Sequence, residues 1–104
     1  MFCFLTVRKV KPGTEEQYVE AARPHELPPG FQWGYQVQSL ADENVIVSFG
    51  LIDRKLEFFT DRMSQDGDFI KEMERRQKAM EPFIEETIVD GVFKVVDELK
   101  EAEF

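Results

Sequence analysis

The sequence predicts an α+β fold, with a four-stranded antiparallel sheet and two helices in the order β-α-β-β-α-β. Segments of alternating or two-sided apolar residues predict strands. A Pro-Gly pair followed by a capping pattern predicts where the first helix begins. Two strand segments joined by a short polar turn predict a hairpin. The chain has 104 residues, so we expect a single domain over residues 1–104.

The first predicted strand covers residues 2–11 and carries apolar side chains on both faces. Phe2 and Phe4 point to one side, and Cys3 and Leu5 point to the other. A strand that is apolar on both faces has to be covered on both faces. Helices can cover one of them, so we expect a second sheet, supplied by a second subunit, to cover the other.

The first predicted helix follows Pro12-Gly13, which ends the strand. Thr14 and Gln17 have the spacing of a capping box, in which the threonine hydroxyl accepts a hydrogen bond from a backbone N–H of the first turn. Pro24 ends the helix. Its expected buried stripe has helical spacing and consists of Tyr18, Ala21 and Ala22.

A loop with three prolines at residues 23–30 separates this helix from a predicted hairpin. The first strand of the hairpin covers residues 31–40, a polar turn covers residues 41–44, and the second strand covers residues 45–52. In the first of these strands, strict alternation predicts one aromatic and apolar face made of Phe31, Trp33, Tyr35 and Val37.

The second half predicts a helical segment over residues 54–63, which Asp66-Gly67-Asp68 interrupts. Asp68 is expected to cap a second, longer helix, and Pro82 to kink or restart that helix. Its expected buried stripe consists of Phe69, Met73, Met80 and Ile84, with Gln77 as the polar member.

The last predicted strand covers residues 91–98, and a frayed end follows it at residues 100–104. Asp90-Gly91 allows an alternative, in which this pair is a hairpin turn between two shorter strands. With either ending, the element order is that of the ferredoxin-like fold, and two such sheets facing each other would close a dimeric α+β barrel.

The charge of the chain excludes several classes of partner. The formal net charge is −8, and no basic face able to neutralise phosphates is found, so we expect no nucleic-acid partner. Anionic membranes are unsuitable for the same reason. The sequence shows no signal-peptide pattern and no apolar run near the ~20 residues of a membrane span. We therefore expect a cytoplasmic protein.

In this order of elements the chain resembles the antibiotic biosynthesis monooxygenase-like group of the dimeric α+β barrel superfamily. The resemblance rests on VRKVKPGTEEQYVEAAR near the start, VIVSFGLID in the hairpin, FIKEMERRQKAMEPFIEE in the long helix and VFKVV in the last strand. It covers most of the chain and describes the fold more specifically than the chemistry. It implies a homodimer with a ligand cavity between the sheet and the helices of each subunit.

The resemblance also implies two kinds of activity. Some members of the group are cofactor-independent oxygenases of polyphenolic or quinol substrates, which would make this chain a monooxygenase of an aromatic small molecule. Others degrade haem with an Asn, Trp and His set whose histidine lies on the long helix. Here that helix has no histidine, and Asn44 falls in a turn. A non-catalytic ligand-binding or assembly module is the alternative to an enzyme.

Cofactor-free oxygenation of a phenol requires a base, a dry pocket and a donor near the developing charge. We predict His25 as the base and Tyr35 as a catalytic hydroxyl. The predicted substrate-binding residues are Trp33, Phe31, Arg8 and Arg62. Two alternatives stay open: the histidine belongs to an exposed loop, and the aromatic row packs under a helix or in the dimer interface.

No metal or cofactor is expected. The chain has one histidine and one cysteine, Cys3, which leaves carboxylates as the main available ligands. Asp66-Gly67-Asp68 resembles part of a calcium loop, but the remaining ligand spacing is missing, so we interpret it as a break between helices. Phosphate-binding glycine loops and nucleophile-elbow serines are not found either.

Overall fold

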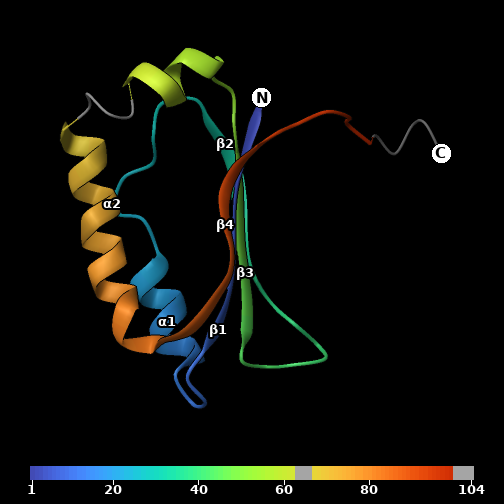
Figure 1. Ribbon diagram of the computed structural model, residues 1–104, viewed down its shortest axis with the longest axis vertical. Coiled ribbons are helices and arrows are strands. Elements are labelled where there is room, and N and C mark those ends of the chain that lie inside the picture. The colour runs from blue at the N-terminus through green and yellow to red at the C-terminus, as the bar shows by residue number, and fades with distance from the viewer. Residues whose placement is uncertain (63–66, 100–104) are drawn as a thin grey trace.

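A computed structural model describes residues 1–62 and 67–99 of the chain, leaving out the side chains of residues 61 and 62. Strands and helices follow one another in the predicted order (Figure 1). The strands are β1 (Phe2–Val10), β2 (Phe31–Gln38), β3 (Val45–Ile52) and β4 (Ile84–Lys94), and the helices are α1 (Glu15–Ala22) and α2 (Gly67–Met80). None of the described helices is long and apolar enough to cross a membrane.

The four strands form one antiparallel sheet in the order β2-β3-β1-β4. The strand that is apolar on both faces, β1, lies inside the sheet between β3 and β4, where both faces need cover. This arrangement confirms the predicted ferredoxin-like fold.

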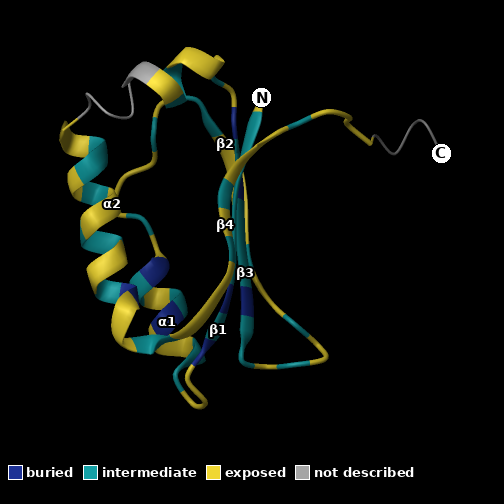
Figure 2. Cartoon of the chain, viewed as in Figure 1, coloured by how far each residue is buried: buried dark blue, intermediate teal, exposed yellow. Residues whose placement is uncertain are grey.

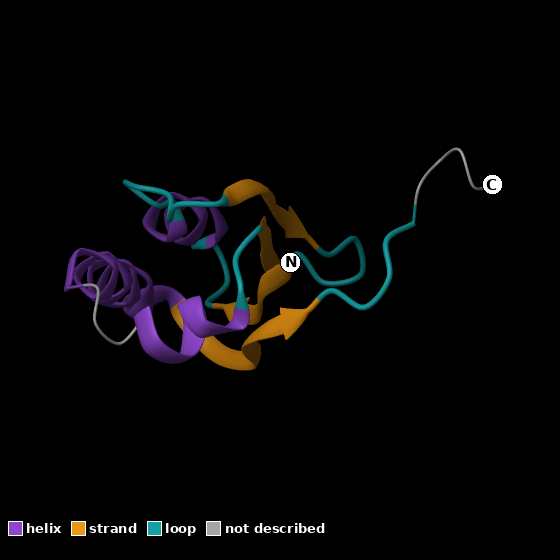
Figure 3. Ribbon diagram, turned by 90° about the horizontal axis from the view of Figure 1, so that it is seen from above, coloured by secondary structure: helices purple, strands orange, loops and turns teal. Residues whose placement is uncertain are grey.

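Both helices lie on the same face of the sheet, which we call the inner face (Figures 1 and 3). The buried residues gather where α1 meets the sheet (Figure 2). Tyr18 and Ala22 of α1 are buried, which confirms the stripe predicted for this helix. The core cluster consists of Val10, Tyr18, Ala22, Ile46 and Met80.

The predicted capping box at the start of α1 is wrong. Thr14 precedes the helix, but its side chain makes no capping hydrogen bond. Its hydroxyl instead donates to the carbonyl oxygen of Lys11 at 2.6 Å, inside the turn that Pro12-Gly13 forms. Gly13 has a φ of +82°, a left-handed conformation that favours glycine and lets the turn close.

The segment between β3 and α2 differs in detail from the expected helix over residues 54–63. Its regular part is a π-helical turn, η1 (Phe58–Arg62), and Met63 and Asp66 of the predicted pattern lie outside the described residues. The longer helix begins at Gly67, so Asp68 lies in its first turn and not at the cap. Acidic side chains in a first turn still favour the positive end of the helix dipole.

The last strand begins earlier than predicted and ends earlier. It starts at Ile84, directly after the 3₁₀ turn η2 (Glu81–Phe83) that contains Pro82, and it ends at Lys94. It passes through Asp90-Gly91 without a turn, so the alternative hairpin is wrong. Pairing with β1 along one edge, with register shifts beside Val7 and Lys9, holds this whole segment in the sheet.

The outer face of the sheet is covered by neither helix (Figure 1). Strand register and alternation place Val7, Val47 and Phe49 on it, beside Trp33 and Tyr35. Several outer-face side chains are exposed although they are large and apolar: Trp33, Tyr35, Val37 and Phe93. Such a continuous exposed apolar face is typical of an interaction surface.

Phe31 does not share a face with Trp33, which corrects the predicted four-residue row. The pairing of β2 with β3 shifts by one residue between them, so Phe31 lies opposite Ile52 and Trp33 opposite Leu51. A β-bulge of this kind reverses the alternation of side chains. Phe31 therefore belongs to the inner face.

Candidate functional site

The inner face carries a polar row that crosses all four strands. By register, the row consists of Gln36, Ser48, Thr6 and Asp90. The Ser48 hydroxyl donates to Oε1 of Gln36 at 3.2 Å, and Nε2 of Gln36 donates to the carbonyl oxygen of Val19 at 3.1 Å. This row gives the centre of the inner face groups that can orient a polar ligand.

The next row of the inner face contains two glycines, Gly34 and Gly50, opposite each other. The ring of Phe31 lies over both: a Cβ at Gly50 would lie 2.8 Å from it, and a Cβ at Gly34 would lie 3.1 Å from it. The predicted substrate-stacking residue Phe31 therefore packs against these two glycines on the inner face of the sheet.

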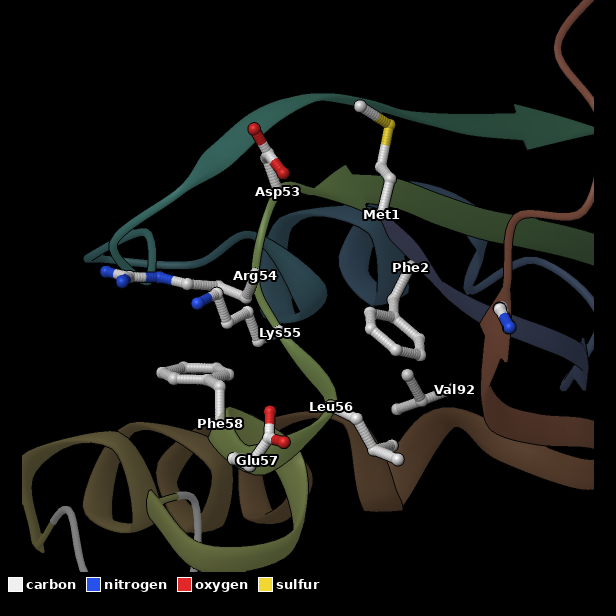
Figure 4. Close-up of a pocket in the computed structure, with 10 residues that line it drawn as sticks. Met1, Phe2, Asp53, Arg54, Lys55, Leu56, Glu57, Phe58 and Val92 are labelled. Atoms are coloured by element: carbon white, nitrogen blue, oxygen red, sulfur yellow. The ribbon is translucent and has the colours of Figure 1, made fainter.

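A groove of about 1200 Å³ lies at the end of the sheet where β1 begins and where the chain leaves β3 (Figure 4). Its apolar wall consists of Met1, Phe2, Leu56, Phe58 and Val92. Its charged lining consists of Asp53, Arg54, Lys55, Glu57 and Lys94. Apolar walls with a few polar groups are typical of small-molecule sites.

Arg54 is held at the rim of this groove from two sides. Its Nε donates to the carbonyl oxygen of Pro29 at 2.7 Å. Its guanidinium carbon lies 5.3 Å from the centroid of the Phe58 ring, which is a cation–π distance. The proline-rich loop is thereby tied to the groove wall.

Arg8 is the buried charged residue of the sheet, with 5% of its surface exposed. Its Nη1 lies 3.4 Å from the Tyr18 hydroxyl and 3.4 Å from Sδ of Met80. Its Nη2 lies 3.7 Å from a carboxylate oxygen of Asp90. Its Nε finds no hydrogen-bond partner among the described residues. Arg8 was predicted to bind substrate, and it lies on the inner face.

Arg76 of α2 was not predicted. The sequence pattern suggested Gln77 as the polar member of the buried stripe, but Gln77 is exposed and Arg76 is half-buried. Burial lowers the pKa of Arg76 below its ordinary value, and the nearby charges of Glu72, Arg75 and Arg8 act on it as well. The Nε atom of Arg76 is buried without a hydrogen-bond partner in the described part of the chain.

His25 lies in the exposed loop, and its backbone N–H donates to Oε1 of Glu72 at 2.9 Å. Arg75 donates to both carboxylate oxygens of Glu72, at 2.8 and 3.1 Å. The Arg75 side chain first, and then the His25 backbone, lower the pKa of Glu72 to about 2. His25 as a general base stays a prediction that requires the loop to fold over a cavity.

Trp33 and Tyr35 lie on the outer face, away from the groove. The Trp33 ring centroid is 5.5 Å from that of Tyr35 and 6.1 Å from that of Phe49. Tyr35 is 62% exposed. The structure therefore separates these two predicted residues from Arg8, which lies on the opposite face of the sheet.

Two further sequence predictions concern Arg62 and metal binding. The side chain of Arg62 lies outside the described residues, so its predicted role stays a prediction. Among the residues that are described, no group of three or more His, Cys, Asp or Glu side chains is placed to hold a metal ion.

No protein-family model and no curated protein matches the sequence. Solved structures do match the fold. A proposed antibiotic biosynthesis monooxygenase from Chloroflexus aurantiacus superposes with a TM-score of 0.69 at 13% identity, over 95% of this chain and 96% of that one. A second, from Nitrosomonas europaea, has a TM-score of 0.65 at 16% identity, over 93% of this chain and 100% of that one.

SnoaB from Streptomyces nogalater, described as a cofactor-independent oxygenase, matches with a TM-score of 0.64 at 17% identity, over 96% of this chain and 97% of that one. Similarities at these identities establish the fold. The chain therefore has the fold of the antibiotic biosynthesis monooxygenase domain proteins, as the sequence resemblance predicted.

Proposed function

We propose that this chain is a cofactor-independent oxygenase that acts on an aromatic small molecule and works as a homodimer. The observation that carries the proposal is the groove walled by Phe2, Leu56 and Phe58. It adjoins the inner face of a fold that the chain shares with SnoaB, a protein described as a cofactor-independent oxygenase. A flat aromatic ring fits between such walls and stacks on them.

The proposed chemistry requires few groups from the protein. Removing the proton of a phenol makes an electron-rich phenolate, which itself reduces dioxygen. One oxygen atom becomes a new ring carbonyl, and the other leaves as water with the two hydrogens that the substrate loses. The product is a quinone, so the substrate supplies all the electrons. The protein contributes a base, apolar side chains on which the ring stacks, and cations near the developing negative charge. Lys55 and Lys94 are cations of this kind in the groove.

Glu57 is the base that we propose for the groove. It lines the groove together with Asp53, and its carboxylate lies between the Phe58 and Leu56 side chains in the view of Figure 4. His25 is the competing base from the sequence prediction; like Glu57 it is exposed, but it does not line the groove. The variants Glu57→Gln and His25→Ala distinguish the two candidate bases.

The test is oxygen uptake with a panel of phenols, naphthols and anthrones in the presence of a metal chelator. We expect uptake that depends on the substrate, and a fall in kcat of about 100-fold in Glu57→Gln, because a positioned base contributes on that order. Glu85→Gln removes an exposed carboxylate on β4 outside the groove and serves as the matched control. A loss confined to His25→Ala would transfer the base role to His25.

A non-catalytic binding or assembly module is the second candidate. The open apolar outer face favours it, because that face can hold a partner whether or not the groove is catalytic. Aromatic ligands that bind the groove without any oxygen uptake across the panel would support this candidate and contradict the oxygenase.

A further inference from the structure

The groove extends further along β4 than along β1. Val92 of β4 lines it. Val92 pairs with Phe4 of β1, so these two side chains lie next to each other on the inner face of the sheet. Phe4 nevertheless does not line the groove, whereas Phe2, two residues before it on the same face of β1, does. Another side chain therefore covers Phe4 and ends the groove over this strand.

The side chain that covers Phe4 is the half-buried ring of Phe59. Its centroid lies 4.7 Å from that of the Phe2 ring and 5.7 Å from that of the Phe4 ring. Aromatic rings that pack against each other have centroids about 4.5–7 Å apart. Phe59 thus packs on both residues, with the groove on its Phe2 side and the interior of the inner face on its Phe4 side.

The π-helical turn η1 holds this ring in position. Phe58, the first residue of the turn, lines the groove (Figure 4). The rings of Phe58 and Phe59 are perpendicular, at 90° and 5.2 Å between centroids. Phe58 in turn packs against Phe69 of α2 and lies under the guanidinium of Arg54. Phe59 therefore contacts three rings in a turn of a rare type that often occurs at functional sites.

We propose that Phe59 is the end wall of the groove, a specificity-determining residue that limits how far a flat ligand extends along β1. Replacing its ring by a methyl group would uncover Phe4 and lengthen the groove by about one ring, and apolar spaces of that size bind aromatic rings. The expectation that the ligand is a flat aromatic molecule rests on the proposed function. The end wall itself rests on the ring contacts and on the residues that line the groove.

The test compares two probes that differ by one linearly fused ring, 2-naphthalenesulfonate and 2-anthracenesulfonate. Neither probe has a phenolic hydroxyl, so their binding is measured apart from any oxygen uptake. Fluorescence titration gives the dissociation constant of each probe, and the ratio of the two constants is the selectivity for ligand length. In the wild-type chain we also expect nuclear Overhauser contacts between the bound naphthalene and the ring of Phe59, because the ligand abuts the end wall.

Phe59→Ala should shift the ratio toward the longer probe by about tenfold, because the third ring gains apolar contacts in the uncovered space. Phe59→Leu, a milder truncation, should shift it in the same direction by a smaller factor, and Phe59→Trp should shift it toward the shorter probe. The matched control is Phe83→Ala, which removes a half-buried ring from the turn before β4, at the end of that strand away from the groove. It should leave the ratio within about twofold.

A ratio that stays within about twofold in all three Phe59 variants would overturn the end wall, and so would equal shifts in Phe59→Ala and Phe83→Ala. A wild-type chain whose Phe59 ring makes no contact with the shorter probe would overturn it as well. The outcome for the oxygenase is separate: a shifted ratio supports the end wall even when no phenol consumes oxygen. Oxygen uptake from phenols together with an unshifted ratio would support the oxygenase and contradict the end wall.

Discussion

At the scale of single residues, Gly34 has the least freedom to change among the strand positions beneath Phe31. A Cβ built on it would lie 2.7 Å from the backbone oxygen of Phe49, which cannot move without distorting β3. We expect Gly34→Ala to lower the free energy of unfolding by about 1–3 kcal/mol, the usual cost of overpacking. Urea unfolding followed by circular dichroism measures it.

Gly67 is the matched control for this substitution. A Cβ at Gly67 meets no atom within 4 Å, and the residue opens α2. Gly67→Ala should be neutral or stabilising by up to about 1 kcal/mol, because alanine restricts the unfolded chain more than glycine does. If both alanine variants unfolded at the same urea concentration, the close approach at Gly34 would have no energetic importance.

The residues of the candidate site were only partly predictable. Arg8 was predicted as a substrate-binding residue, and it lies buried on the inner face; its role in binding stays a prediction. Arg76 was missed since the polar member of the α2 stripe was placed one residue away, at Gln77. One residue turns a helix by about 100°, so a small error in phase exchanges a buried side chain for an exposed one.

At the scale of elements, Glu72 ties the proline-rich loop to α2. It binds the backbone N–H of His25, and Arg75 of the same helix turn also donates to the carbonyl oxygen of Arg23. The loop connects α1 to β2, so this contact fixes how the hairpin approaches the helices. A carboxylate is needed, because a neutral acid accepts these hydrogen bonds less well.

The pKa of Glu72 therefore predicts how the loop responds to acid. It is lowered from 4.5 to about 2 in the folded chain, chiefly by the Arg75 side chain. A lowered folded-state pKa gives stability that is present above pH 4.5 and lost as the pH falls toward 2. We expect the His25 amide signal in NMR to move with a midpoint near pH 2. A midpoint near 4.5 would contradict the contact.

Variants of the same helix separate the contact from general effects of charge. Glu72→Gln should speed hydrogen exchange at the backbone of His25, since the acceptor loses its charge. Glu74→Gln removes an equal charge from an exposed position of α2 and should leave that exchange rate unchanged.

The elements themselves were largely predictable, and their ends less so. Hydrophobic alternation predicted the ends of β2 and β3 to within two residues. The ends were predictable because polar residues alternate along β2 and a polar turn separates the two strands. The start of β4 was missed. Ile84 continues the helical spacing of α2, and the glutamates after it are poor strand formers. Residues 84–90 form a strand because they pair with the central β1, and the pattern of a single sequence does not reveal which segments pair.

At the scale of the whole molecule, the exposed apolar outer face of the sheet predicts a partner that covers it. Val37 lies on it, 42% exposed, near a large group of apolar side chains. We expect the chain to scatter light as a dimer of twice its 12.2 kDa mass at micromolar concentration. Val37→Lys should make it a monomer, because a buried unpaired charge is strongly unfavourable in an interface.

Gln17→Lys adds the same side chain on the exposed surface of α1 and should stay dimeric. A wild-type chain with the mass of one subunit would contradict the homodimer. A dimer that survives Val37→Lys would place the interface on another surface.

The ring of Phe31 also affects how proteins with this fold could come to accept substrates of different size. Gly34 cannot accept a larger residue without moving the backbone of β3, and at Gly50 the atoms in the way belong to the Phe31 ring, which a substitution can make smaller. Exchanging it for a smaller residue would open a void directly beside the polar row, on a sheet that stays unchanged. Position 31 is therefore where natural or laboratory selection could adjust the size of an accepted substrate, with the loss of packing on the two glycines as the cost to stability.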